Sequence, residues 1–244
     1  MGANLAYEWT AADYRRLARS QDLVSFTLRV KQTDMRISAE ADLGTEALAL
    51  VLDARAQVEG YIGCRPEFLR SLVPLDDDRS APTVVAAMLD AARRANVGPM
   101  AAVAGAIAEH VGRGLGAKSP EVIVENGGDL YLCSRQRREL TLLAENTALG
   151  GIHITVPPAP EGAGIATSAG TLGHSLSFGN ADAVMVVAES GALADALATA
   201  IGNIVQCETD LAPALARARS MGARAAVIVA DGHLAAFGDI ELTG

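Results

Sequence analysis

A pair of β-hairpin signals, one near each end of the chain, is the feature that most constrains its fold. The segments LVSFTLRV and DMRISAE alternate apolar and polar residues on either side of the short turn KQT. Near the C-terminus, Asp231-Gly232 separates two apolar runs, and this dipeptide suits the tight turn of an antiparallel hairpin. Further strands with Gly-rich turns are predicted at EVIVENGGDLYLCS, ELTLLAE, GIHITV and AVMVVAES.

Helices are predicted in groups between these strands, because apolar or small residues recur there with helical spacing. Pro82 stands at the start of one of them, where proline is well tolerated. The predicted helices cover residues 45–62, 83–94, 97–116 and 191–201, a stretch from about Asp210, a stretch from Thr10, and a short segment in PEFLRSLVPL before Pro74. Antiparallel hairpins mixed with grouped helices favour an α+β fold, with antiparallel sheets packed against helices.

The two halves of the sequence are expected to form one unit. No Pro/Gly-rich linker separates them, and the polar segments DDDRSAPT and PPAPEGAG read as loops. We therefore predict a single domain over residues 1–244, with two interlocked halves.

Composition narrows the class of protein. Hydrophobic residues make up 50% of the chain and aromatic residues only 4%, so the core is expected to consist mainly of Ala, Val, Leu and Ile. No apolar run approaches the roughly 20 residues of a membrane helix, and no secretory signal is visible at the start. Three widely spaced cysteines without a C-x-x-C pair favour reduced thiols and a cytoplasmic location. High apolar content is compatible with a homodimer.

The negative net charge of the chain argues against nucleic acid as a partner. The chain carries a formal charge of -9 and has a pI near 4.9, whereas nucleic-acid binders show a basic stripe. The basic cluster RQRRE (135–139) reads as a solvated turn. An acidic protein that binds a phosphate-bearing ligand needs metal ions or backbone N–H groups to do so.

A carboxylate in an apolar helix is the first candidate for chemistry. Within VMVVAESGALADALATAIGN, Ser190 is a plausible N-cap, and Asp195 and Thr199 lie four positions apart on one helix face. A charge on an apolar face is costly unless it is paired. One interpretation is a structural pair, with Thr199 bonded to its own backbone and Asp195 to an arginine. The other is a hard cation such as Mg²⁺, with Asp195 ionised and facing a pocket.

Two glycine-rich segments are the remaining candidates. GIATSAGTLGHSLSFG (164–179) reads as a loop whose N–H groups can approach phosphate, although it is neither a Walker A loop nor a dinucleotide fingerprint. His174 lies in the same segment, and two interpretations of it stay open: an incidental loop histidine or a catalytic residue. NGGD (126–129) is either ordinary hairpin punctuation or part of a ligand site.

Taken in order, these pieces resemble the FAD:protein FMN transferase (ApbE-like) superfamily, and in particular a shorter branch of it. The resemblance covers roughly residues 97–206 and is closest for GIATSAG and ALADALATAIGN. It implies an α+β fold, a flavin nucleotide (FAD or FMN), and Mg²⁺ held partly by Asp195 and Thr199. The nucleotide-binding residues that it implies are Asn126, Gly127, Gly128, Asp129, Ala166, Thr167, Ser168 and Gly170, with His174 as the catalytic residue.

The chain departs from that superfamily at two places. HSLSFGNADAV replaces the usual H-I-I-D-P-x-T-G segment, and Ala104 stands where a lysine is usual. Three functions therefore stay open. The chain is an Mg²⁺-dependent enzyme that transfers FMN to a flavoprotein acceptor or hydrolyses FAD, a non-catalytic small-molecule binding module, or a protein whose Asp195 and Thr199 are purely structural.

Overall fold

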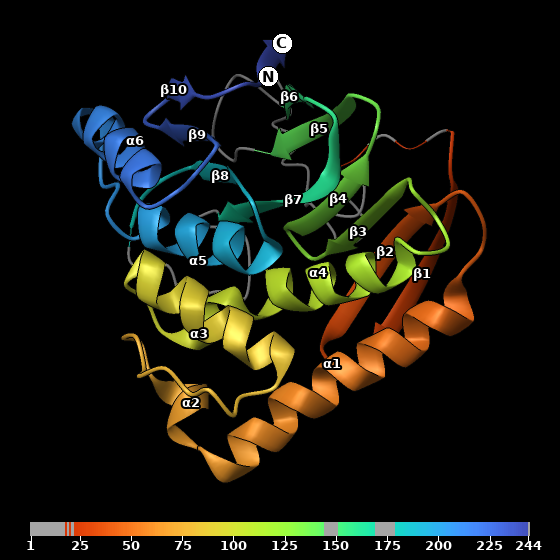
Figure 1. Ribbon diagram of the computed structural model, residues 1–244. Helices are drawn as coiled ribbons and strands as arrows, with labels where there is room; N and C mark the ends of the chain where they lie inside the picture. Colours follow the sequence, from red (N-terminus) through yellow and green to blue (C-terminus); the bar gives the residue numbers. More distant parts are fainter. Residues whose placement is uncertain (1–17, 19, 21, 144–150, 169–178, 244) are drawn as a thin grey trace, which may run out of the picture.

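Strands and helices follow one another in blocks, and the strands assemble into two antiparallel sheets (Figure 1). The computed structural model describes residues 18, 20, 22–143, 151–168 and 179–243. Within these residues, the large sheet has eight strands in the order β1 (Val24–Val30), β2 (Thr33–Ala39), β3 (Val122–Asn126), β4 (Asp129–Ser134), β7 (Ala159–Ser168), β8 (Ala183–Ala188), β9 (Ala225–Ala230) and β10 (His233–Phe237). The small sheet has the order β11 (Glu241–Thr243), β6 (Gly151–Val156) and β5 (Arg138–Leu143).

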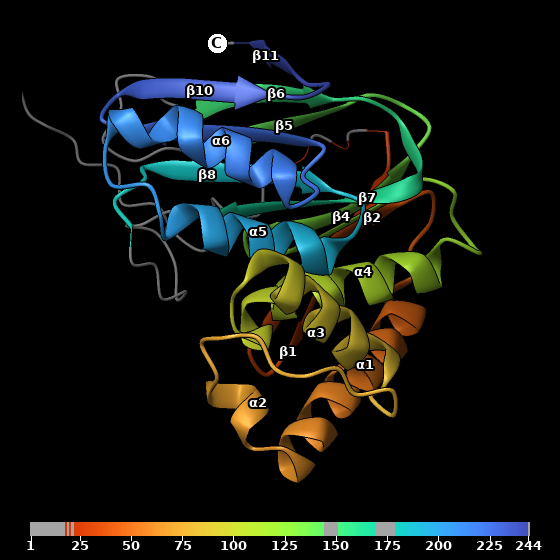
Figure 2. The same cartoon turned by 60° about the vertical axis from the view of Figure 1, so that its left-hand side comes forward.

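The helices lie on one face of the large sheet and the small sheet lies on the other (Figure 2). The described helices are α1 (Gly44–Cys64), α2 (Glu67–Arg70), α3 (Thr83–Ala95), α4 (Val103–Leu115), α5 (Gly191–Gly202) and α6 (Leu211–Ser220), with 3₁₀ turns η2 (Pro99–Ala102) and η3 (Glu208–Asp210). None of the described helices combines the length and apolarity needed to cross a membrane. The architecture is therefore three layers, with a core on each side of the large sheet.

Burial on both faces explains why the central strands read as continuous apolar runs. In β8, Val184 and Val186 pack in the core beneath the helices, whereas Met185 and Val187 pack in the core shared with the small sheet. All six residues of this strand are buried. A strand covered on one face only would alternate apolar and polar residues instead.

The α+β prediction is confirmed, and so are the local signals that carried it. The two predicted hairpins form as β1–β2 and β9–β10, although Thr33, assigned to the first turn, already pairs in β2. Asp231 and Gly232 have φ angles of 52° and 73°, as a tight hairpin turn requires. The Ser190 side chain caps α5 by accepting a hydrogen bond from the Leu193 N–H. The helix predicted from Thr10 lies outside the described residues.

The loop predicted at PPAPEGAG, and its continuation into GIATS, is wrong. From Ala159 onward these residues form the ten-residue strand β7, which pairs with both β4 and β8; only the two prolines at the start of the segment lie outside the strand. Its glycines serve close packing within a strand. A Cβ on Gly162 would lie 2.0 Å from the Tyr131 hydroxyl, and one on Gly164 would lie 2.1 Å from the Ser190 carbonyl oxygen. Gly164 must be small because α5 begins directly against the strand, and Gly162 must be small because Tyr131 of β4 lies against it.

The solvated turn predicted at RQRRE is also wrong for its fourth residue. Arg138 is 4% exposed and begins β5. Its guanidinium donates to Glu121 at 2.8 Å and to Asp22 at 2.7 Å, and its Nε donates to the Ser134 hydroxyl at 3.0 Å. A planar guanidinium can satisfy several acceptors at once, which makes its burial tolerable. The network ties β5 of the small sheet to the large sheet.

Arg138→Ala should destabilise the protein by about 3 kcal/mol, because it leaves the Glu121 carboxylate buried without its cation. Denaturant unfolding measures the loss. The double variant Arg138→Met with Glu121→Gln should recover more than half of it, since no buried charge is then left unpaired and Asp22, which also loses its partner, is exposed. A double variant no more stable than Arg138→Ala would contradict this account.

The same pair predicts a pH dependence. Burial raises the pKa of Glu121, but hydrogen bonds from Ser134 and Arg138 outweigh burial and lower this pKa below its ordinary value of 4.5. The stabilisation is therefore present above pH 4.5 and is lost as the pH falls through the lowered pKa. The difference in free energy of unfolding between wild type and Arg138→Ala, measured with denaturant, should therefore become smaller as the pH falls through this acid range.

Candidate functional site

The candidate site is built around an unusually close crossing of α4 and α5. A Cβ on Gly105 would lie 2.2 Å from the Gly191 carbonyl oxygen, and a Cβ on Gly191 would lie 2.3 Å from the Gly105 carbonyl oxygen. No side chain fits at either position, so two glycines allow the backbones to touch. Each helix thus brings its polar backbone groups within reach of the other.

Two carboxylates use this approach reciprocally. The Gly105 N–H donates to Asp195 of α5 at 2.9 Å, and the Gly191 N–H donates to Glu109 of α4 at 2.8 Å. Each acid lies four residues after the glycine of its own helix, in the shared pattern Gly-Ala-apolar-Ala-acid. One turn of helix separates glycine from acid, so the two pairs form a symmetrical clamp. We call these four residues the glycine–acid clamp.

The two acids of the clamp differ in what balances their charge. Glu109 accepts from the Arg113 Nε at 2.7 Å. Asp195 forms no ion pair with a basic side chain among the residues that the structure describes, which excludes an arginine there as its partner. Its electrostatic neighbour is a second carboxylate, Asp129. Arg113 therefore neutralises Glu109, whereas Asp195 lies near a second acid, Asp129.

The environment of this acid pair disfavours its charged form. Burial raises the pKa of Asp195 to about 7, against the lowering effect of N–H groups from Gly105 and Ala104. Burial, and next the charge of Asp195, raise the pKa of Asp129 well above its ordinary value. In the absence of a cation, this raised pKa means that Asp195 holds its proton to a higher pH than an ordinary aspartate does. That Asp195 is ionised when a cation is bound stays a prediction. A bound cation would restore the charge of both groups.

The β3–β4 turn places Asp129 in this position. Asn126 is buried and its side-chain amide donates to the Ala104 carbonyl at the start of α4, at 3.0 Å. Gly127 takes a φ of 67°, which glycine adopts without strain. The turn is thereby fixed to the N-terminal end of α4, and Asp129 directly follows it.

The end of β7 completes the arrangement. Ala166 pairs with Asp129 across the β4–β7 ladder. The backbone N–H and the hydroxyl of Thr167 both donate to the Gly128 carbonyl, at 3.1 and 2.9 Å. Ser168 follows as the last residue of the strand. The NGGD turn and the ATS segment, both of which the family resemblance assigns to nucleotide binding, therefore meet.

Thr199 lies one helical turn after Asp195 on α5 and is partly exposed. Gly170 and His174 fall outside the described residues. Among those described, no three His, Cys, Asp or Glu side chains converge as a metal site. A cation held by Asp129 and Asp195 would therefore draw its other donors from hydroxyl groups, carbonyls, ligand oxygens or water, which suits Mg²⁺.

Sequence reasoning missed the glycine–acid clamp and the pairing of Asp129 with Asp195. A usable signal was present, because GAIAE (105–109) and GALAD (191–195) share one pattern. A pattern of this kind does not say which helices touch. It nevertheless marks two glycine faces that can approach closely.

Gly105→Ala should destabilise the protein by about 3 kcal/mol, because the added methyl group must push α4 and α5 apart. Gly60→Ala on α1 is the matched control, since nothing lies within 4 Å of a Cβ there. This second change should stabilise α1 by about 0.5–1 kcal/mol through helix propensity. Equal effects of the two substitutions in thermal unfolding would refute a tight crossing.

Asp195→Asn should change how stability depends on pH in protein freed of metal by a chelator. The raised pKa means that the folded state keeps a proton at Asp195 between the ordinary value of 3.8 and about 7. This contribution is present below pH 3.8 and is lost as the pH rises through about 7. The variant should therefore gain stability relative to wild type, by up to about 4 kcal/mol, between pH 4 and pH 8, since each unit of pKa shift corresponds to about 1.4 kcal/mol. A gain independent of pH would argue against a perturbed carboxylate.

Comparisons with known proteins show which family and which fold this chain resembles. A family model described as "AbpE bacteria" matches residues 15–236. A UPF0280 protein of Methanocaldococcus jannaschii is 42% identical over 179 residues, covering 71% of this chain and 72% of that protein. A UPF0280 protein of Methanothermobacter thermautotrophicus is 38% identical over 190 residues, covering 75% and 72%.

Solved structures share the fold at low sequence identity. The flavin transferase ApbE of Vibrio cholerae superposes with a TM-score of 0.57 at 13% identity, covering 90% of this chain and 97% of that one. The ApbE protein of Thermotoga maritima gives a TM-score of 0.56 at 13% identity, covering 90% and 96%. At such identities the likeness establishes the fold alone.

Proposed function

The chain belongs to the bacterial AbpE family within the ApbE-like superfamily, and from this premise we propose that it binds a flavin nucleotide together with Mg²⁺. The observation that carries the proposal is the asymmetry of the glycine–acid clamp. Glu109 has Arg113 as its counter-ion, whereas Asp195 has a second carboxylate beside it. A divalent cation is the group that this half of the clamp needs.

Each residue then has a definite task. Asp195 and Asp129 would hold the cation, with the Thr199 hydroxyl as a further oxygen donor. Mg²⁺, when bound, supplies positive charge that balances a diphosphate on an acidic protein. Thr167 and Ser168, at the end of β7, would lie against the phosphate oxygens.

The reaction that fits is phosphoryl transfer from FAD. The oxygen of a Ser or Thr hydroxyl on an acceptor protein attacks the FMN phosphorus, the bond to the AMP oxygen breaks, and AMP leaves. The hydroxyl gives up its proton, for which His174 is the candidate acceptor. With water as the nucleophile the products are FMN and AMP.

A non-catalytic binding module is the second candidate. Ala104 stands at the site in place of the usual lysine, and its carbonyl accepts a hydrogen bond from the Asn126 side chain. This loss, with the replaced H-I-I-D-P-x-T-G segment, favours ligand binding without efficient transfer. We propose the cytoplasm as the compartment and a flavoprotein as the acceptor or redox partner, with a homodimer as the assembly.

The deciding experiment uses the full chain with FAD, Mg²⁺ and a Thr-containing acceptor peptide. We expect binding with a Kd of about 1 μM, or about 8 kcal/mol, and a thermal midpoint that rises with Mg²⁺. Asp195→Asn should abolish the Mg²⁺ response. Glu109→Gln is the matched control, because it removes the reciprocal carboxylate, and it should leave the response intact.

The products distinguish the candidates. A peptide heavier by one FMN identifies the transferase, and free FMN with AMP identifies the hydrolase. Binding without either product identifies the module. Calorimetry that finds no binding of FAD, FMN or AMP at millimolar concentration would reject the whole proposal.

A further inference from the structure

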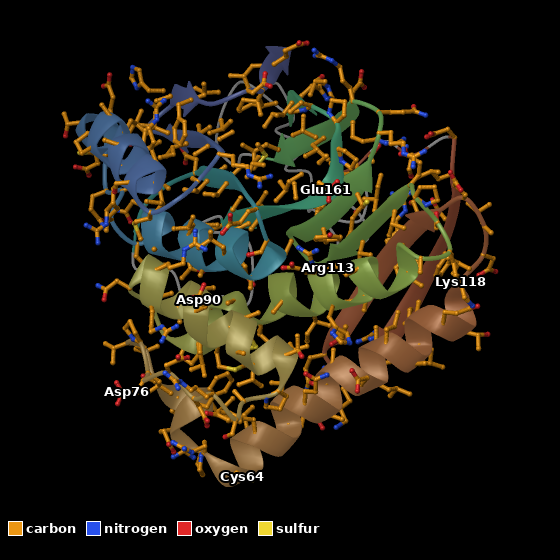
Figure 3. All side chains as sticks on the ribbon, viewed as in Figure 1. Cys64, Asp76, Asp90, Arg113, Lys118 and Glu161 are labelled. Carbon is orange, nitrogen blue, oxygen red and sulfur yellow. The ribbon has the colours of Figure 1, made fainter. Side chains whose placement is uncertain are left out.

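A second candidate site lies at a cavity of about 450 Å³ that is separate from the Asp129–Asp195 pair. It opens where α3, α4, β7 and the start of α5 meet. Of the residues that line it, Figure 3 labels Asp90, Arg113 and Glu161. Asp129 and Asp195 do not line it. Its volume is in the range of small-molecule sites, roughly 300–1,000 Å³.

The charged side chains that line the cavity balance one another. Three are basic and three are acidic: Arg94, Arg113, Arg224, Asp90, Glu161 and Glu189. Such a lining opposes a ligand that carries only negative charge, because its own carboxylates repel it. The same lining opposes a ligand that carries only positive charge. A ligand that carries both signs satisfies both sets.

Most of these charges already have partners. Arg94 pairs with Glu189 at 2.7 Å and with Asp90 at 3.7 Å. Arg113 pairs with Glu109, within the glycine–acid clamp.

Two charges of opposite sign are left over. The side chains of Arg224 and Glu161 are solvent-exposed and make no hydrogen bond or ion pair with any residue that the structure describes, although Arg224 lies near enough to Glu189 to help lower the pKa of that carboxyl. Arg224 precedes β9 and Glu161 belongs to β7, so different elements present these two charges to one cavity.

We propose that this cavity binds a small zwitterion of the amino-acid class. The ligand carboxylate would pair with Arg224, and its ammonium group with Glu161. Arg94 can assist, because its ion pair with Glu189 is solvent-exposed and exposed pairs contribute little to stability. A guanidinium can then donate two parallel hydrogen bonds to the ligand carboxylate. The proposal needs neither flavin nor metal.

The test is calorimetry or NMR titration on the full chain, with a chelator present and without flavin. The probes are L-alanine and L-glutamate, their ammonium-free counterparts propionate and glutarate, and ethylamine as the carboxylate-free probe. At least one amino acid should bind about tenfold more tightly than its ammonium-free counterpart and than ethylamine. Arg224→Gln and Glu161→Gln should each weaken that binding about tenfold. Arg217→Gln, an exposed arginine on α6 outside the cavity, is the matched control and should change nothing.

Three results would overturn the proposal. The first is that neither amino acid binds at high millimolar concentration. The second is that the ammonium-free acids bind as tightly as the amino acids, which identifies a simple anion site. The third is that binding survives both Arg224→Gln and Glu161→Gln. Because Mg²⁺ and flavin are absent throughout, failure here leaves the proposed flavin function untouched.

Discussion

The contact between α4 and α5 at Gly105 and Gly191 is the constraint on which the rest of the site depends. Because each backbone occupies the space of the other's missing Cβ, the two helices can pack in only one relative position here. That position brings Asp195 to the N-terminal end of α4, where Asn126 also anchors the β3–β4 turn. Two residues without side chains thus bring together polar groups from three separate parts of the chain.

The clamp also shows how the same geometry can give opposite electrostatics. Glu109 and Asp195 occupy matching positions and accept matching hydrogen bonds. Glu109 forms an ion pair with Arg113, whereas the electrostatic neighbour of Asp195 is another acid, Asp129. A partly buried acid pair persists in a folded protein when something outside the chain, a proton or a cation, offsets its cost. Within the part of the chain that the structure describes, no basic side chain neutralises Asp195, and this defines the site as much as the two acids do.

Local signals made much of the fold predictable, and long-range contacts limited the rest. Hairpin turns and the Ser190 cap depend on neighbouring residues, so the sequence specified them directly. The strand β7 was missed because Pro and Gly are typical of loops. Gly162 is required because Tyr131 of another strand occupies the space where its side chain would lie, and no local pattern reveals that contact. Arg138 was placed in solvent because its acidic partners lie elsewhere in the sequence. The meeting of NGGD with ATS came from family resemblance, and Asp129 beside Asp195 came only from the structure.

The strand order of the large sheet has a consequence for folding kinetics. Its strands follow chain order, so hairpins such as β9–β10 close short loops and can form early. The pairing of β2 with β3 is different, because α1, α3 and α4 all intervene in the sequence. Closing so long a loop is entropically slow until packed helices shorten the distance. The β1–β2 hairpin is thus expected to join the sheet late, after the helical layer has formed a surface for it.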